Sequence, residues 1–117
     1  MQQKKMAIEK LKNYDIMCKA VENLPLEIKL CKDSETRKAL KKSLQDARFW
    51  RLQAQRGLQV LQPAERLILE QLYVYPSGKG AVQRLCQMLQ VESSSVYRYR
   101  DRALEKFAKA LFGGMEN

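Results

Sequence analysis

The side chains best suited to recognition chemistry lie close together in the C-terminal half of the chain. They are the hydroxyls of Ser93 and Ser94, the phenol of Tyr97 and the guanidinium groups of Arg98 and Arg102. Ser94, Arg98 and Arg102 recur every four residues, so on a helix they share one face. An arginine so placed can donate two parallel hydrogen bonds to a guanine, and hydroxyls can reach base edges or phosphates. The alternative interpretation is a solvated helix face that binds nothing.

The chain lacks the residues that usually support catalysis or metal binding. The chain contains no histidine, which is the commonest general base and metal ligand. Cys18, Cys31 and Cys86 are far apart and without the paired spacing of a zinc site, and Lys79 between two glycines lacks the spacing of a P-loop. We therefore expect no enzyme activity, no cofactor and no metal, and reduced cysteines in a cytoplasmic protein.

The charge balance favours an anionic partner. The 117 residues include 22 Lys and Arg and 13 Asp and Glu, which gives a net charge of +9 and an isoelectric point near 9.6. Such a surface also serves plain solubility, so charge alone does not decide the function. No apolar run approaches the length of a membrane span, and the first residues do not resemble a signal peptide.

Two helices joined by a tight turn are predicted to position the recognition side chains. Leu85 and Leu89 lie one helical turn apart, Val91 follows in the turn, and Val96 and Tyr99 are spaced to close over the same core. Cys86 is the small residue where the two helices would approach. This arrangement predicts a helix-turn-helix, whose second helix enters the major groove of DNA.

The second of these helices is predicted to be amphipathic. Residues 92–95 should supply capping side chains at its start. Arg100 falls within the apolar arc, so we expect it to reach toward solvent or to pair with Glu65 or Glu70. The residues expected to face the core are Val96, Ala103, Phe107, Ala110 and Leu111.

The run from residue 85 to residue 106 resembles the C-terminal helix-turn-helix of sigma factors, region 4. The matching residues are Leu85-Cys86-x-x-Leu89-x-Val91-x-Ser93-x-Ser95-Val96-Tyr97-Arg98-x-Arg100-x-Arg102-Ala103-Leu104-Glu105-Lys106. Residues 61–73 resemble the preceding helix of that family. Gln90 stands where the family usually has a glycine in the turn. Because a residue other than glycine seldom has a positive φ, we expect a turn that is either slightly different in shape or mildly strained. The layout, a long helical half followed by this motif, is similar to the ArpU/RinA-type regulators of phage late genes.

The resemblance implies a sequence-specific transcriptional regulator, encoded by a phage or prophage, that binds double-stranded DNA. Two alternatives stay open: a small terminase-type DNA-packaging subunit, and a protein whose sigma-like domain docks on RNA polymerase. The residues expected to contact DNA are Ser93, Ser94, Tyr97, Arg98, Arg102, Arg84 and Lys79, with Arg98 reading a base and Tyr97, Arg102, Arg84 and Lys79 holding phosphates.

The N-terminal half is predicted to form an oligomerisation arm. A first helix over residues 3–23 should end before Pro25. In residues 24–31 the apolar side chains alternate with period two, which favours an extended segment, but their spacing would equally suit a single helical turn. We interpret this stretch as a connector. Residues 34–61 read as a long helix that starts at Asp33-Ser34, with Gly57 as a weak point. This helix is apolar on more than one side, so we expect a homodimer. The predicted interface is Leu40, Leu44, Ala47, Phe49, Trp50 and Leu58.

The expected architecture is all-α in two parts. Residues 1–62 form the arm, and residues 63–112 form the helix-turn-helix domain. A helix starting at Pro63 should precede the motif, followed by a loop over residues 75–80. The inward face of that helix is predicted to be Leu67, Leu69, Leu72 and Tyr73, and Gly113-Gly114 should end the last helix.

Overall fold

The computed structural model describes residues 2–75 and 78–113. Throughout these residues the regular structure is helical, which confirms the all-α prediction. The elements are α1 (Gln2–Lys12), α2 (Tyr14–Leu30), α3 (Ser34–Gln59), α4 (Pro63–Leu69), the π-helical segment η1 (Glu70–Val74), α5 (Ala81–Leu89) and α6 (Ser93–Phe112).

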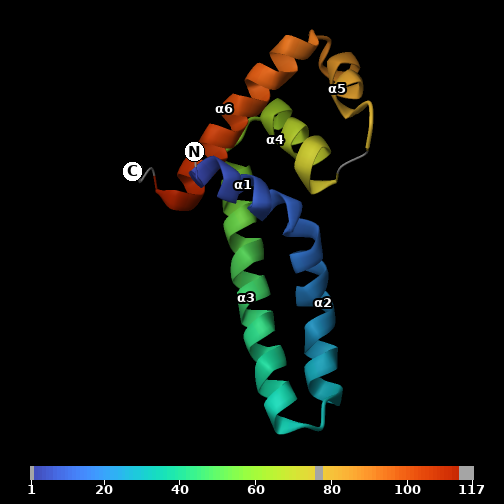
Figure 1. The fold of residues 1–117 in the computed structure, drawn as a ribbon, viewed down its shortest axis with the longest axis vertical. Coiled ribbons are helices and arrows are strands. Elements are labelled where there is room, and N and C mark those ends of the chain that lie inside the picture. The colour runs from blue at the N-terminus through green and yellow to red at the C-terminus, as the bar shows by residue number, and fades with distance from the viewer. Residues whose placement is uncertain (1, 76–77, 114–117) are drawn as a thin grey trace.

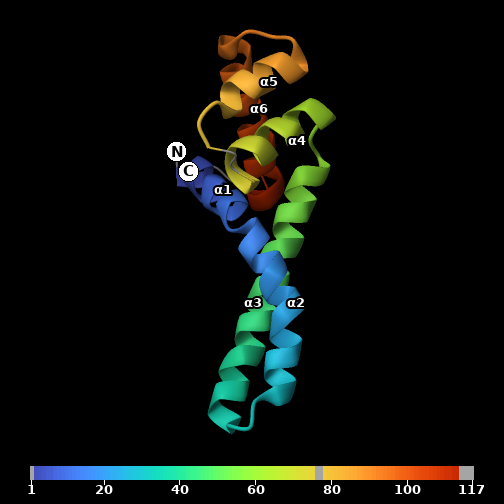
Figure 2. The same ribbon diagram turned by 90° about the vertical axis from the view of Figure 1, so that its right-hand side faces the viewer.

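The molecule is elongated, with extents of 55 × 33 × 20 Å. Helices α2 and α3 lie side by side as a long hairpin, which we call the arm (Figure 1). The other helices lie around the C-terminal end of α3. The turn between α2 and α3, which forms the tip of the arm, stands clear of them in both views (Figure 2). The arm is therefore a single layer of two helices.

Helix α2 continues through Pro25, so the predicted helix end is wrong, and the predicted connector over residues 24–31 is helical as far as Leu30. A proline inside a helix removes one backbone hydrogen bond, but packing can outweigh that loss. Leu24 and Ile28, four residues apart, are half-buried on the side of α2 that faces α3. Leu26 and Leu30 fall on the opposite side and are exposed. The alternating apolar pattern is thus two helical stripes and not a strand.

The predicted first helix is interrupted at Asn13, which separates α1 from α2. Its side-chain amide donates to the carbonyl of Glu9 at 2.9 Å, a local bond that competes with regular helix. The bend lets α1 cross the C-terminal helices, where Ala7 and Leu11 are fully buried. Burial of this short apolar stripe explains why the chain turns here.

The start of α3 matches the prediction. The carboxylate of Asp33 accepts hydrogen bonds from the backbone amide of Thr36 at 2.8 Å and from its hydroxyl at 2.6 Å. These two bonds lower the pKa of Asp33. The Arg37 guanidinium donates to the carbonyl of Cys31, so it ties the end of α2 to the start of α3. A capped helix start and a bridged turn together close the tip of the arm.

The larger core joins the arm to the C-terminal helices. It brings together residues of α1, α3, α4, η1 and α6 around Phe107, which is fully buried. Gly57 lies directly against that ring: a Cβ atom built there would sit 2.5 Å from the Phe107 Cδ1 and Cε1 atoms. Gly57 is therefore a site of close helix approach, which corrects the prediction of a mere weak point. Residue 62 separates two helices but does not divide this core.

A second, smaller core lies inside the helix-turn-helix. Ile68, Leu85 and Val96 are fully buried, and Leu89, Val91, Tyr99 and Cys86 pack around them as predicted. Ile68 was not predicted. Along α6, Val96, Ala103 and Phe107 are buried and Leu111 is half-buried, but Ala110 is exposed, and Leu104 and Ala108 are buried in its place. The inner face of α6 is thus rotated slightly from the predicted one, because α1 also packs on it.

Two further predictions need adjustment. Glu92 occupies the N-cap of α6 without a side-chain hydrogen bond, so the predicted side-chain cap is absent. Of the predicted inward face after Pro63, Leu69 is buried, while Leu67, Leu72 and Tyr73 are half-buried. Gly113 ends α6 with φ of 64°, as predicted. Pro76 and Ser77 of the predicted loop, and residues 114–117, lie outside the described residues.

The predicted oligomer interface is largely used within one chain. Leu44, Ala47 and Leu58 are buried and Leu40 is half-buried within the single chain, so these four residues offer little surface to a second copy. Trp50 is also engaged. Its Nε1 atom donates to the Lys10 carbonyl at 3.0 Å, and the Lys10 ammonium lies 3.7 Å from the ring centroid. Of the six predicted interface residues, only Phe49 is exposed, and 62 % of it is accessible to solvent.

None of the helices in the described residues is both long and apolar enough to cross a bilayer.

Candidate nucleic-acid interface

The turn between α5 and α6 depends on one residue in a left-handed conformation. Gln90 has φ of 57° and ψ of 48°, so of the two expected outcomes, a different turn or a strained one, the structure shows the left-handed conformation that a glycine would adopt there. The Val91 amide donates to the Cys86 carbonyl at 3.1 Å, closing the end of α5. The chain then becomes extended at Glu92 and enters α6. This geometry orients the start of α6 outward from the smaller core.

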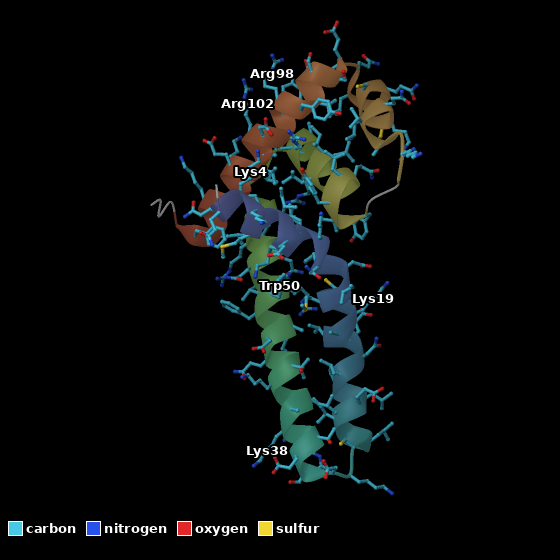
Figure 3. All side chains as sticks on the ribbon, in the orientation of Figure 1. Lys4, Lys19, Lys38, Trp50, Arg98 and Arg102 are labelled. Atoms are coloured by element: carbon cyan, nitrogen blue, oxygen red, sulfur yellow. The ribbon has the colours of Figure 1, made fainter. Side chains whose placement is uncertain are left out.

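The predicted recognition residues of α6 form a continuous exposed face. Ser93, Ser94, Tyr97, Arg98 and Arg102 are all exposed. Figure 3 shows Arg98 and Arg102 projecting from the same side of α6, away from α4 and α5. The opposite side is anchored by the fully buried Val96 and Ala103. The helix is therefore held by its inner face, and its polar face is open over more than two turns.

The guanidinium of Arg98 is restrained by its own helix. It donates to the Ser95 Oγ atom at 3.2 Å and lies 5.8 Å from the centroid of the Tyr99 ring. Both contacts are exposed, so they cost little to exchange for contacts to a ligand. Arg98 can accordingly extend to present its fork of donors to a planar acceptor pair.

Arg100 has a different partner from those predicted. Its guanidinium pairs with the Asp101 carboxylate, with nitrogen–oxygen distances of 2.9 and 3.1 Å, and lies 5.1 Å from the Tyr97 ring centroid. Glu65 instead pairs with Lys106 at 2.9 Å. The bond from Arg100, aided by the charge of Lys4, lowers the pKa of Asp101. Arg100 thus neutralises an acid on the outer face of α6 and supports the Tyr97 ring.

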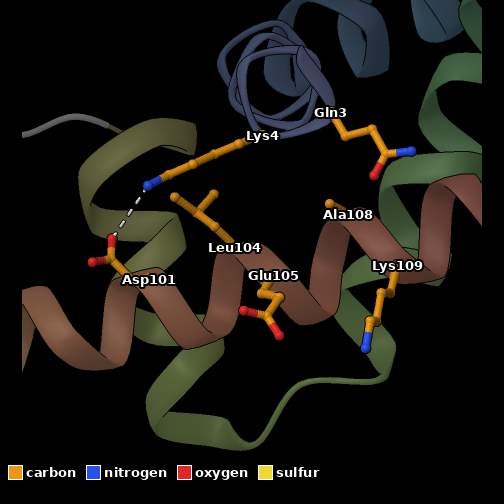
Figure 4. A pocket seen from close by; sticks show the side chains of 7 residues that line it. All are labelled: Gln3, Lys4, Asp101, Leu104, Glu105, Ala108 and Lys109. Atoms are coloured by element: carbon orange, nitrogen blue, oxygen red, sulfur yellow. Dashed lines mark ion pairs between the residues drawn. The ribbon is translucent and has the colours of Figure 1, made fainter. Parts of the chain in front are cut away.

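Helix α1 adds a lysine beside this face. The Lys4 ammonium lies 3.5 Å from the Asp101 carboxylate, across an open hollow of about 620 Å³ between α1 and α6 (Figure 4). Leu104 and Ala108 line the hollow, together with charges of both signs from Glu105 and Lys109. The mixed charges do not converge on one ligand. The hollow therefore does not have the lining of a small-molecule site, and its clearest polar contact is the ion pair between Lys4 and Asp101.

The structure brings Lys79 and Tyr97 together. Both line a second hollow of about 620 Å³ between the start of α5, η1 and α6. Gln71 and Gln83 line it too, and their amides can donate and accept hydrogen bonds, which the sequence analysis did not include. Arg84, one turn into α5, is exposed. Lys79, Gln83 and Tyr97 therefore extend the polar face of α6 toward the start of α5.

The arrangement suits hydrogen bonding to an anionic polymer. Arginines, serines and a tyrosine share one exposed face, with lysines at both flanks. Within residues 2–75 and 78–113, no group of three or more Cys, Asp or Glu residues is placed to hold a metal ion. The face thus offers fixed positive charge and hydrogen-bond donors.

Comparisons of the chain with models of protein families, with curated proteins and with solved structures returned no significant match. The functional argument therefore depends on the geometry of α5 and α6 and on the residues of their outer face.

Proposed function

We propose that this protein binds double-stranded DNA sequence-specifically through α6 and acts as a transcriptional regulator. The observation that carries the proposal is the division of α6 into two faces. Its inner face is fully buried at Val96, Ala103 and Phe107, while Arg98 and Arg102 project outward on the other side. A helix held in this way can enter the major groove without disturbing the fold.

The side chains of the outer face match the chemistry of DNA. Arg98 lies one turn from the start of α6, and this end of a recognition helix contacts base edges. Arg102 lies one turn further on, and Lys79 lies across the hollow beside Tyr97; both suit phosphate. The net charge of +9 supports the approach of a polyanion. A regulator encoded by a phage or prophage fits the similarity of the layout to the ArpU/RinA-type regulators.

The test uses DNA sites chosen by selection from a random duplex library. Arg98→Ala should weaken binding to the selected site by about 1–3 kcal/mol and relax the choice of one base pair, because a base contact is lost. Arg102→Ala should weaken binding to all sequences alike and reduce the salt slope by about one ion, because a phosphate contact is lost. Fluorescence anisotropy at several salt concentrations measures both effects.

Lys38→Ala is the matched control. Lys38 is an exposed cation at the far end of the arm (Figure 3), so its loss changes the net charge equally without touching α6. Arg37 is less suitable because it bonds to the Cys31 carbonyl. If Arg98→Ala and Lys38→Ala weaken binding to the selected site equally, the charge acts diffusely and the proposal fails. If no duplex is selected, a protein-docking role for this face becomes the better account.

A further inference from the structure

The outer side of α2 carries a second apolar stripe that none of the described helices covers. Ile16, Leu26 and Leu30 are 62, 60 and 68 % exposed. With Lys19 and Asn23 they follow the three-and-four spacing of a heptad seam, with residues 16, 23 and 30 at one repeating position and 19 and 26 at the other. We call these five residues the outer stripe. It lies opposite the side of α2 that packs on α3.

The arm is incompletely buried. Helix α2 contains no buried residue over its 17 positions, although it packs along α3 for its whole length. Single exposed apolar side chains are ordinary, but three at heptad spacing on a helix with no buried residue indicate a missing layer. The outer stripe therefore has the pattern of a helix surface that is covered in the functional molecule.

We propose that a second copy of this chain covers the outer stripe, with the two α2 helices packed antiparallel about a two-fold axis. In this orientation a residue of the 16, 23, 30 position on one helix lies across from a residue of the 19, 26 position on the other helix. Ile16 lies across from Leu26 of the partner subunit, and Lys19 lies across from Asn23 of the partner subunit. In each copy Leu26 is thus set against an apolar side chain, and Lys19 meets an amide that can accept a hydrogen bond. Leu30 lies beyond the last of these pairs.

The charges beside the outer stripe favour the antiparallel orientation. Asp15 then lies beside Lys29 of the partner subunit at both ends of the interface, which gives two attractive pairs. One repulsive pair remains, between the two copies of Glu22. The parallel orientation sets Lys19 against its own copy in the seam and Glu22 against Glu27 of the partner subunit on both sides. Like charges at such positions are destabilising, so parallel pairing is disfavoured.

The exposed side of α3 is a poorer place for the second copy. It carries Phe49 and Leu52, which are 62 and 43 % exposed. Cations outnumber anions among its other exposed residues: Lys38, Lys41, Lys42, Arg48 and Arg56 against Glu35 and Asp46. A two-fold pairing of this side with itself would set these cations against one another. The outer stripe of α2 is less charged and more apolar, so it is the self-complementary surface.

Sedimentation equilibrium across the micromolar range tests the assembly. The chain should sediment with twice its 13.6 kDa mass at high concentration. Leu26→Lys should raise the dimer dissociation constant by at least about tenfold, because a charge replaces a buried leucine at both copies. Leu52→Lys is the matched control: the same exchange on the exposed side of α3 should leave the constant within about twofold. Circular dichroism checks that both variants keep their helices.

Disulfide trapping tests the orientation in a background where Cys18, Cys31 and Cys86 are replaced by serine. Glu22→Cys lies close to the two-fold axis, so antiparallel helices should form the intermolecular disulfide on mild oxidation. Leu30→Cys should not, since its two copies would be roughly 27 Å apart along the axis. The outcomes that overturn the proposal are a monomer at every concentration, equal effects of Leu26→Lys and Leu52→Lys, an assembly larger than two, or trapping at Leu30→Cys.

Discussion

At the scale of single residues, Gly57 shows that a position's role depends on what lies across from it. Glycine inside an exposed helix costs roughly 1 kcal/mol relative to alanine. Here the Phe107 ring occupies the space that a Cβ atom would need, at 2.5 Å. The absence of a side chain therefore permits α3 and α6 to approach, and the helical cost of glycine is offset by the packing of a buried aromatic ring.

We expect Gly57→Ala to lower the free energy of unfolding by roughly 1–2 kcal/mol, since overpacking outweighs the gain in helix propensity. Urea denaturation followed by circular dichroism measures the change. Phe107→Leu in the same chain should restore part of the loss, so the double variant should be more stable than the sum of the single effects implies. A higher free energy of unfolding for Gly57→Ala would show that the Phe107 ring can move aside without a loss of stability, and it would contradict this prediction.

At the scale of elements, Glu65 joins the start of α4 to α6. Its carboxylate accepts the Gln62 backbone amide at 2.9 Å and pairs with the Lys106 ammonium at 2.9 Å. Burial alone would raise the pKa of Glu65, but these two partners outweigh it and hold the pKa below its ordinary value. A carboxylate with a lowered pKa stabilises the fold above the ordinary value, and this contribution disappears as pH falls through the folded-state pKa.

We expect Glu65→Gln to lower the free energy of unfolding by about 1 kcal/mol near neutral pH. The difference from the parent chain should shrink as pH falls below about 4, where the parent carboxylate also becomes neutral. Denaturant titrations between neutral and acidic pH measure the gap. Glu105→Gln, at an exposed position of α6, should show little difference at any pH. A gap that stays constant down to low pH would contradict the role given to the charge.

At the scale of the whole molecule, the arm and the helix-turn-helix share one core. Leu11 of α1 and Leu58 of α3 pack in the same cluster as Leu104 and Phe107 of α6. The polar face of α6 is consequently supported by helices that lie far away in the sequence. The tip of the arm, by contrast, contributes only to the hairpin and stands clear of the rest (Figure 1).

A fragment of residues 62–117 should therefore fail to unfold cooperatively, because it exposes the apolar surface that α1 and α3 cover in the whole chain. Thermal melting followed by circular dichroism should give a broad, low-amplitude change, against a sigmoidal transition for the full chain. A sharp transition in the fragment would mean that the smaller core around Ile68, Leu85 and Val96 suffices.

The sequence by itself determined those features that depend on residues close together along the chain. Asp33 caps α3, and Ser94, Arg98 and Arg102 share an exposed face, because these outcomes depend on neighbours within about one helical turn. The apolar spacing around Leu85 likewise determined the part of the smaller core that α5 and α6 supply, but not Ile68 of α4.

Tertiary structure decided the rest. Pro25 remains inside α2 because packing against α3 outweighs a lost backbone bond, and Trp50 turns to Lys10 because the bend at Asn13 brings α1 to α3. Gly57 and Phe107 are 50 positions apart and meet only when the chain folds. Contacts of this kind depend on which surfaces come together in space, and no local pattern of residues encodes that choice.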